Sequence, residues 1–254
     1  MRRKFIVGNW KMHKGPADAD ALADTLKRAL AGRDAKVDVG VAPPFVSLSA
    51  VVSRLKHTGI LVAAQNLHSE AQGAFTGEIS GEMLRQVGVA YCLVGHSERR
   101  QFFGDTDAFV EKKVAACFRS GLLPILCVGE TLAEREAGKE REVVTRQLTA
   151  AIGKLQADQV PSVTIAYEPV WAIGTGKTAS PLQAQEMHAT IRGWLESSFP
   201  AFVARSTRLQ YGGSVKGSNA AELLKMPDID GALVGGAALN AEEFLAIVEA
   251  ANAA

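Results

Sequence analysis

The amino-acid sequence predicts an α/β protein built as one (β/α)8 barrel over residues 1–254. Short apolar runs alternate with longer stretches of helical periodicity, and eight such pairs fit a chain of 254 residues. Buried parallel strands are expected to be continuously apolar, because helices cover one face of the sheet and the barrel interior covers the other. A doubly wound open sheet is the alternative that this pattern leaves open. No linker or low-complexity stretch indicates a second domain.

The eight predicted strands are apolar runs, most of them rich in Val, Ile and Leu. In chain order they read KFIV (4–7), VDVGV (37–41), ILVAA (60–64), AYCLV (90–94), LLPILCV (122–128), SVTIAY (162–167), TRLQY (207–211) and GALVG (231–235). A stretch of helical period follows each run. These predicted helices span residues 18–31, 48–56, 81–87, 108–120, 139–155, 181–198, 219–224 and 241–250.

Start and stop signals support individual helices. Phe109, Val114 and Phe118 form an apolar stripe in the fourth predicted helix, and a glycine follows its end. Ser180 supplies an N-cap to the helix at 181–198, and Pro181 takes its first turn. The segment SERRQFF, directly after His96, predicts an additional short helix.

The charge balance argues against a nucleic-acid or membrane partner. Lys and Arg number 28 against 27 Asp and Glu, so the formal net charge is only +1. No segment approaches the roughly 18 apolar residues of a membrane span, and the apolar part of MRRKFIV is too short for a signal peptide. The three cysteines, at 92, 117 and 127, lack metal-ligand spacing and are expected to be reduced core thiols. We therefore expect a cytoplasmic protein that holds any anion locally.

Polar residues and glycines cluster where the predicted strands end. They are Asn9, Lys11, Gln65, Asn66, His96, Glu130, Glu168, Ser214, Gly235 and Gly236. In a closed barrel these residues rim the C-terminal face, where barrel enzymes carry their sites. One polar residue after a strand is usually turn chemistry, so the indication comes from their convergence. Four other histidines lack such company, and we expect solvated or structural roles for them: His13, His57, His68 and His188.

The stretch AYEPVWAIGTGKT admits two interpretations, a nucleotide-binding loop or a lid behind a carboxylate. A P-loop needs a glycine where this chain has Trp171. The GxGxxA match that begins at Gly174 does not directly follow a strand, so the dinucleotide fingerprint is weak. A lid remains, in which a proline stiffens one end, apolar residues seal a pocket and glycines approach a ligand. The predicted lid residues are Pro169, Val170, Trp171, Ala172, Ile173, Gly174, Thr175, Gly176, Lys177, Thr178 and Ala179.

Six motifs in order resemble the triosephosphate isomerase family from one end of the chain to the other. They are GNWKM (8–12), GHSERR (95–100), CVGE (127–130), YEPVWAIGTGKTA (167–179), YGGSV (211–215) and LVGGA (233–237). The resemblance implies a TIM barrel that acts as a homodimer with neither metal nor cofactor. It also implies that the substrates are the triose phosphates dihydroxyacetone phosphate and glyceraldehyde 3-phosphate.

The same resemblance implies a role for each matching residue. The catalytic residues would be Glu168 as base, His96 as electrophile, Lys11 as cation and Asn9 as an orienting group. Backbone N–H groups of Gly174, Ser214, Gly235 and Gly236 would bind the phosphate. Apart from the resemblance, we expect Ser97 and Glu98 to support the histidine from behind, and for Glu130 an ion pair that orders the rim is an equal alternative to such a supporting role.

These residue types suit an aldose–ketose isomerisation. One carboxylate can serve both reacting carbons in turn, because its two oxygens reach them without rotation of the substrate. The enediolate intermediate needs a proton donor and positive charge at its oxygens, and a neutral imidazole matches it in proton affinity. A Schiff-base aldolase using Lys11 or Lys177, and a non-catalytic sugar-phosphate binding protein, are the alternatives.

The segment from 65 to 79 carries no helical stripe and is too long for a simple connection. By resemblance it inserts into a second subunit, with Phe75 and Thr76 near the active-site residues of that subunit. Two positions depart from the family pattern. Asp105 stands where glutamate is common, close to the expected interface, and Ala238 stands where serine is common, which would alter one hydrogen bond on the phosphate side.

Overall fold

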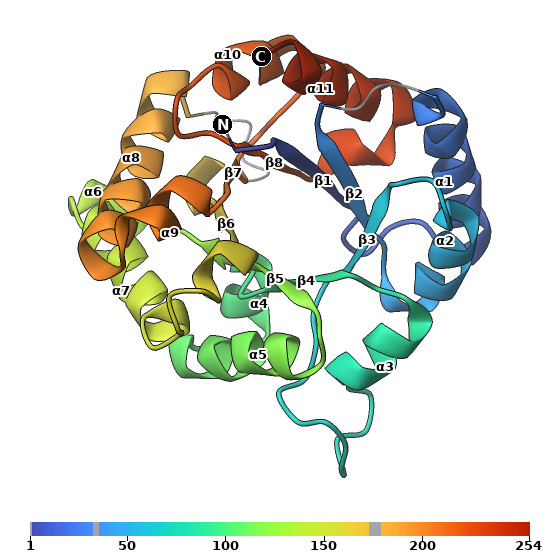
Figure 1. Ribbon diagram of the computed structural model, residues 1–254, viewed down its shortest axis with the longest axis horizontal. Coiled ribbons are helices and arrows are strands. Elements are labelled where there is room, and N and C mark those ends of the chain that lie inside the picture. The colour runs from blue at the N-terminus through green and yellow to red at the C-terminus, as the bar shows by residue number, and fades with distance from the viewer. Residues whose placement is uncertain (1, 33–35, 173–178) are drawn as a thin grey trace.

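The computed structural model describes residues 2–32, 36–172 and 179–254, and its centre is a closed barrel of eight parallel strands (Figure 1). The strands are β1 (Phe5–Asn9), β2 (Asp38–Ala42), β3 (Leu61–Ala64), β4 (Tyr91–Val94), β5 (Leu123–Val128), β6 (Thr164–Tyr167), β7 (Leu209–Tyr211) and β8 (Gly231–Val234). Each strand pairs with the next, and β8 closes on β1. The (β/α)8 barrel is confirmed, and the doubly wound alternative is wrong.

Helices surround the barrel as an outer ring (Figure 1). They are α1 (Pro16–Leu30), α2 (Leu48–Leu55), α3 (Gly81–Val87), α4 (Ser97–Phe102), α5 (Asp107–Arg119), α6 (Leu132–Glu136), α7 (Glu140–Ile152), α8 (Pro181–Ser198), α9 (Ala201–Ser206), α10 (Gly217–Leu224) and α11 (Ala241–Ala253). Short 3₁₀ helices are η1 (Phe45–Ser47), η2 (Val160–Ser162), η3 (Val170–Ala172) and η4 (Gly236–Leu239). All eight predicted helices are present, and α4 is the short helix expected after His96.

The helices α6 and α9 were not predicted. A capping box begins α6: the Thr131 hydroxyl accepts the N–H of Glu134, and the Glu134 carboxylate accepts the N–H of Thr131 at 2.8 Å. The pattern Thr-x-x-Glu in the sequence could have indicated this start. Helix α9 follows Pro200 at its N-cap position. Both helices have fewer than seven residues, which is too short for hydrophobic periodicity to detect them.

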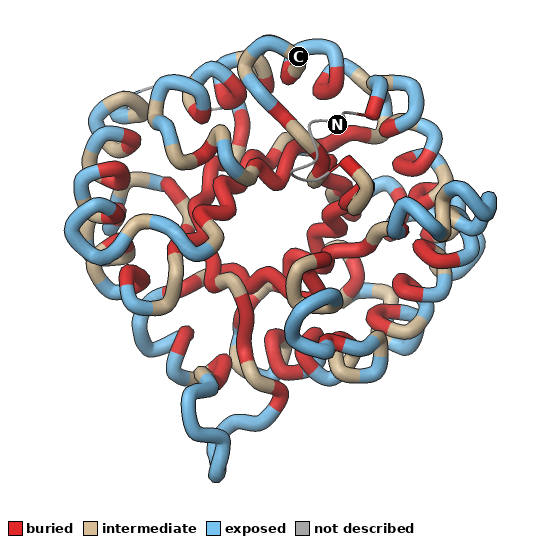
Figure 2. The backbone as a smooth tube through the Cα atoms, turned by 180° about the vertical axis from the view of Figure 1, so that it is seen from behind, coloured by how far each residue is buried: buried red, intermediate tan, exposed pale blue. Residues whose placement is uncertain are grey.

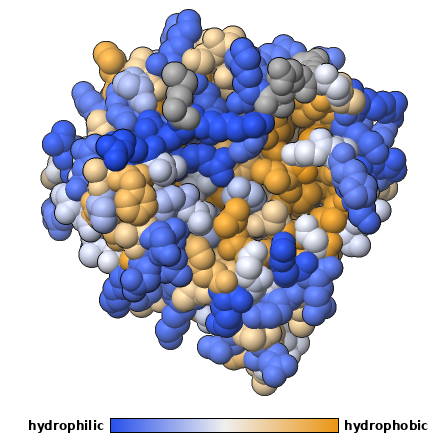
Figure 3. All heavy atoms as spheres, viewed as in Figure 1, coloured by the Kyte–Doolittle hydropathy of each residue, from blue (hydrophilic) through white to orange (hydrophobic). Residues whose placement is uncertain are grey.

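Burial follows the barrel layers (Figure 2). The strands form a buried ring, while the outer faces of the helices are exposed. In α1 the buried residues Ala19, Leu22, Ala23 and Leu26 recur at helical spacing, so one stripe of the helix packs on the sheet. On the face in Figure 3, hydrophilic residues dominate the rim and hydrophobic residues gather towards the middle. The segment 70–78 is exposed along its whole length and projects beyond the ring (Figures 1 and 2).

Closure of the barrel depends on a glycine at the start of β8. Gly231 pairs with Phe5 and has a φ of 149°, a conformation that favours glycine. A Cβ atom at this position would lie 1.9 Å from the Phe5 carbonyl oxygen. Any larger residue would therefore push β8 away from β1.

Within the described residues, no helix is long and apolar enough to cross a membrane.

Helix α8 carries a histidine into the core. His188 is fully buried, and its Nδ1 lies 3.0 Å from the carbonyl oxygen of Asp228. Burial lowers the pKa of His188 from 6.5 to about 4. The folded protein therefore binds fewer protons at this site than the unfolded chain between pH 4 and pH 6.5.

This depressed pKa predicts a specific loss of stability in acid. The contribution of His188 is fully present above pH 6.5 and is lost as the pH falls towards 4, by about 3 kcal/mol in total. Urea unfolding at fixed protein concentration across this range should give a steeper pH dependence for the natural protein than for His188→Gln. Parallel stability curves for the two proteins would show that His188 does not titrate with a depressed pKa.

Candidate active site

A cavity of about 540 Å³ opens at the C-terminal end of the barrel. It brings together seven residues predicted from the sequence: Asn9, Lys11, His96, Glu168, Ser214, Gly235 and Gly236. The remaining lining residues are Gly212, Gly213, Val215, Lys216, Leu233, Ala237 and Glu243. Except for Glu243 of α11, these groups come from the ends of β1, β4, β6, β7 and β8, so closure of the barrel assembles them.

The carboxylate of Glu168 directly faces the ring of His96. Its Oε1 lies 3.0 Å from His96 Nε2, and its Oε2 accepts the backbone N–H of Ser97 at 2.9 Å. Both side chains are buried, at 2% and 8% exposed. A buried carboxylate that accepts two hydrogen bonds is held in one orientation, which suits a base that must reach defined atoms.

The surroundings of His96 determine which nitrogen carries its proton. Nδ1 accepts the backbone N–H of Glu98 at 3.2 Å, because His96 is the N-cap residue of α4. A nitrogen that accepts a hydrogen bond carries no proton, so the ring is neutral with its proton on Nε2. Nε2–H therefore points into the cavity and donates to Glu168. A neutral imidazole at this position is also what the resemblance to the family implies.

Lys11 is held in a backbone conformation that is uncommon for lysine. Its φ is 50°; its N–H donates to Asn9 Oδ1 at 3.0 Å, and its carbonyl accepts from Gln65 Nε2 at 2.7 Å. The side chains of Asn9 and Gln65 therefore satisfy the backbone N–H and the backbone carbonyl of Lys11. Its Nζ donates to Glu98 Oε1 at 2.5 Å, so the two side chains form an ion pair at the cavity wall. Gln65 was noted in the sequence only as polar, and its contact with Lys11 was not foreseen.

Glycines in the cavity wall make room for neighbouring groups. A Cβ at Gly212 would lie 2.8 Å from Glu168 Cγ, and a Cβ at Gly213 would lie 2.2 Å from the Tyr211 hydroxyl. A Cβ at Gly235 would lie 3.5 Å from Lys11 Cε. Small residues here let the backbone approach a ligand closely, as phosphate binding by N–H groups requires.

Glu130 organises the start of the predicted lid. Its Oε1 accepts hydrogen bonds from Tyr167 Oη at 3.0 Å, Trp171 Nε1 at 2.8 Å and Arg135 at 3.0 Å. The ion pair predicted for Glu130 is therefore present, with Arg135 as its partner. Burial and the Glu130 carboxylate raise the pKa of Tyr167, so its hydroxyl stays a donor.

Two further titratable groups lie near the site. Burial raises the pKa of Tyr211 to about 12. Burial raises the pKa of the Cys127 thiol well above its usual range, and the nearby carboxylate of Glu168 acts in the same direction. Both groups are therefore neutral at pH 7 and add no charge beside the base.

Other predicted residues have different positions. Pro169 to Ala172 are described, and Ala179 is buried, whereas Ile173, Gly174, Thr175, Gly176, Lys177 and Thr178 lie outside the described residues. Phe75 and Thr76 sit at the projecting loop and do not line the cavity. Lys216 and Glu243 do line it, although no motif singled them out.

The two departures from the family pattern are both buried. Ala238 does not line the cavity; a Cβ at Gly8 would lie 2.9 Å from its Cβ. Asp105 Oδ2 accepts from Lys113 Nζ at 2.7 Å and from Arg99 at 3.2 Å, while Oδ1 has no partner among the described residues. The short aspartate therefore keeps two cations but uses only one of its oxygens.

Comparison with known proteins gives one consistent result. A family model described as triosephosphate isomerase matches residues 4–251. Curated proteins named triosephosphate isomerase are similar over almost the whole chain: the protein of Prosthecochloris aestuarii is 55% identical over 99% of both chains. Those of Moorella thermoacetica and Syntrophotalea carbinolica are 54% and 53% identical, each over 98% of both chains. This chain belongs to the triosephosphate isomerase family.

Proposed function

We propose that the cavity interconverts dihydroxyacetone phosphate and D-glyceraldehyde 3-phosphate, with Glu168 as the base. The protein is an isomerase of triose phosphates, and this reaction is a step of glycolysis and gluconeogenesis. The observation that carries the assignment of residues is the contact of 3.0 Å between the Glu168 carboxylate and His96 Nε2 in a cavity that also contains Lys11. A coupled assay with glyceraldehyde 3-phosphate and no added metal tests the activity.

Each group has a distinct task in this proposal. Glu168 removes a proton from the carbon next to the carbonyl and returns it to the neighbouring carbon. His96 Nε2–H donates to the substrate oxygen, and the ammonium of Lys11 stabilises the negative charge that develops there. Asn9 orients Lys11 through the bond of 3.0 Å between Asn9 Oδ1 and the Lys11 N–H. Ser97 holds the carboxylate, and Glu98 holds both His96 and Lys11.

At the phosphate end of the cavity, backbone groups take the place of the side chains that act on the reacting carbons. Backbone N–H groups of Ser214, Gly235 and Gly236 bind the dianion, and the glycines allow its close approach. By resemblance Gly174 adds another N–H group from the lid, and the stretch Pro169–Ala179 closes over the intermediate. The described start of this stretch is tied to Glu130 through Trp171 Nε1 at 2.8 Å.

The ion pair of Lys11 disfavours an aldolase. A Schiff base forms from a neutral amine, whereas Lys11 Nζ donates to Glu98 Oε1 at 2.5 Å as an ammonium. A carboxylate base next to a neutral imidazole donor would also have no task in a simple sugar-phosphate binding protein. Proton transfer therefore accounts for more of the site than either alternative.

A homodimer completes the proposal. A second cavity of about 180 Å³ lies beside the first and is lined by Asn9, Lys11, Met12, Phe45, Gln65, Asn66, Leu93, His96, Glu98, Arg99 and Phe103. Met12 is 92% exposed and Phe103 is 66% exposed, so apolar surface surrounds this opening. The projecting loop with Phe75 and Thr76 at its tip would fill the opening of a second subunit. The whole chain would then act as one catalytic domain in each protomer.

A location in the cytoplasm fits the cysteines. Cys92, Cys117 and Cys127 are free and buried. Thiols that remain unpaired are usual in reducing compartments. The triose phosphate substrates belong to central carbon metabolism, and nucleic acid and membranes have no place in this proposal.

The first prediction from this proposed function concerns the placement of the base. Glu168→Asp withdraws the carboxylate by one methylene and should lower kcat about a hundredfold or more while KM changes less than about threefold. Glu168→Gln retains the length of the side chain but removes the base, and it should lower kcat further. Steady-state kinetics with both triose phosphates provide the measurement. Full activity in both variants would remove Glu168 from the mechanism.

The second prediction concerns the cation. Lys11→Met retains the length of the side chain but deletes its charge, and it should lower kcat/KM at least about a hundredfold with the fold retained. It should also weaken the binding of 2-phosphoglycolate. Lys14→Met is the matched control, because Lys14 also has a positive φ, 67°, but does not line the cavity. Equal losses in the two variants would refute a specific role for Lys11.

The third prediction concerns the subunit contact. Phe75→Asp places a charge at the tip of the projecting loop and should convert the dimer to monomers in sedimentation velocity, with activity lower by about tenfold or more. Phe202→Asp is the control, because the two phenylalanines are equally exposed, at 43% and 44%. A monomeric natural protein with full activity would contradict the dimer.

A further inference from the structure

A buried histidine packs against the last residues of the two strands that lead to the base and to the phosphate loop. His188 of α8 packs edge-on against the ring of Tyr167, with ring centroids 5.9 Å apart. Its ring centroid also lies 6.3 Å from that of Tyr211. Tyr167 ends β6 directly before Glu168, and Tyr211 ends β7 directly before the glycines of the phosphate loop. The His188 side chain therefore contacts both the residue that precedes the base and the residue that precedes the phosphate loop.

Only one of the two ring nitrogens of His188 has a hydrogen-bond partner among the described residues. In the neutral ring, Nδ1–H donates to the carbonyl of Asp228 at 3.0 Å. Nε2 is buried and has no hydrogen-bond partner among the described residues. An unpaired buried nitrogen is unfavourable, so this position carries a polar ring at a cost in stability. The Asp228 bond fixes the direction of the ring, and the ring packs against both tyrosines.

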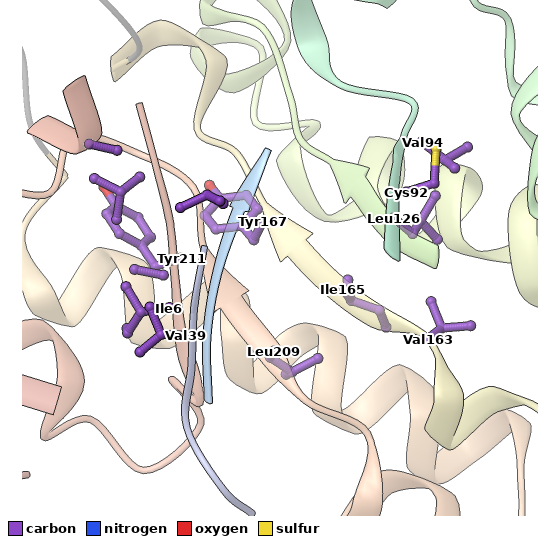
Figure 4. Close-up of a cluster of buried hydrophobic side chains, with 14 of the residues drawn as sticks. Ile6, Val39, Cys92, Val94, Leu126, Val163, Ile165, Tyr167, Leu209 and Tyr211 are labelled. Atoms are coloured by element: carbon purple, nitrogen blue, oxygen red, sulfur yellow. The ribbon is translucent and has the colours of Figure 1, made fainter. Parts of the chain in front are cut away.

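Both tyrosines transmit their position to the active site. The Tyr167 hydroxyl donates to Glu130 Oε1 at 3.0 Å, and the Tyr167 carbonyl accepts the N–H of Gly212 at 2.7 Å. The Tyr211 hydroxyl lies so close to Gly213 that a Cβ there would be 2.2 Å from it. Figure 4 shows both tyrosines among the buried side chains of the core. A shift of either ring would therefore move the base or the phosphate loop.

We propose that His188 is a positioning residue that sets the separation between the base on β6 and the phosphate loop on β7. The inference rests on the proposed function and deepens it, because His188 itself touches no substrate. A base and a phosphate site that are misplaced by a fraction of an ångström lose turnover and affinity together. Removal of the ring should therefore change both kcat and KM, although the residues that line the cavity remain the same.

Two variants separate the ring from its hydrogen bond. His188→Gln retains a donor for the Asp228 carbonyl but removes the ring, whereas His188→Phe retains a ring but removes the donor. Leu195→Ala is the control for destabilisation, because Leu195 is fully buried two turns further along α8 and leaves the histidine and both tyrosines intact. All variants are measured at a temperature at which circular dichroism and sedimentation show that each of them is folded like the natural protein.

The experiment compares kcat, KM and the affinity for 2-phosphoglycolate. His188→Gln should lower kcat/KM about tenfold or more and weaken inhibitor binding about fivefold, whereas His188→Phe stays within about threefold of the natural protein. Leu195→Ala should lose stability with kinetics within about twofold of the natural protein. Natural kinetics and inhibitor affinity in His188→Gln, or equal losses in Leu195→Ala, would overturn the inference. A natural protein without isomerase activity would overturn the proposed function instead, and inhibitor affinity would still decide the role of His188.

Discussion

Glu168 occupies a gap between neighbouring strands that only glycines leave open. A Cβ at Gly129 would lie 1.8 Å from the Glu168 carbonyl oxygen, and a Cβ at Gly212 would lie 2.8 Å from Glu168 Cγ. The residue after β5 and the residue after β7 therefore approach the base from both sides. Because protein interiors are close-packed and transmit strain, the position of the carboxylate depends on this contact. The hydrogen bonds to Ser97 and His96 then fix its direction.

Buried polar groups extend this constraint to the rest of the rim. Glu130 collects three donors at Oε1, while its Oε2 is buried without a partner among the described residues. A half-satisfied carboxylate of this kind is costly in a core. It links Arg135 of α6 with Tyr167 and with Trp171 at the start of the predicted lid. The Glu130 side chain therefore contributes both to the order of the rim and to the placement of the base.

The sequence predicted the barrel and seven of the residues that line its main cavity. Eight apolar runs and their helices reflect burial on two faces, a physical requirement that leaves a clear periodic signal. The convergence of His96 and Glu168 follows from their positions at strand ends, since closure brings all strand ends to one rim. Short elements such as α6 were missed because five residues carry no period.

Contacts between distant residues could not be predicted. Gln65 binds the Lys11 carbonyl across 54 positions of sequence, and no local pattern specifies that pair. The same holds for His188, for which the sequence predicts only a solvated or structural role, whereas the fold packs its ring against Tyr167 and Tyr211. Ala238, for which an effect on the phosphate side is expected, is buried near Gly8 and does not line the cavity, so that expectation stays a prediction.

The most direct test of the proposed chemistry is a crystal structure of the protein with 2-phosphoglycolate, whose carboxylate imitates the oxygens of the enediolate. The proposal predicts that His96 Nε2 and Lys11 Nζ donate to that carboxylate. Glu168 would leave the Ser97 N–H and face the reacting carbons, and the phosphate would accept from the N–H groups of Ser214, Gly235 and Gly236. A ligand bound with its phosphate at Lys11, or with Glu168 still on Ser97 and out of reach of the carbons, would contradict the account.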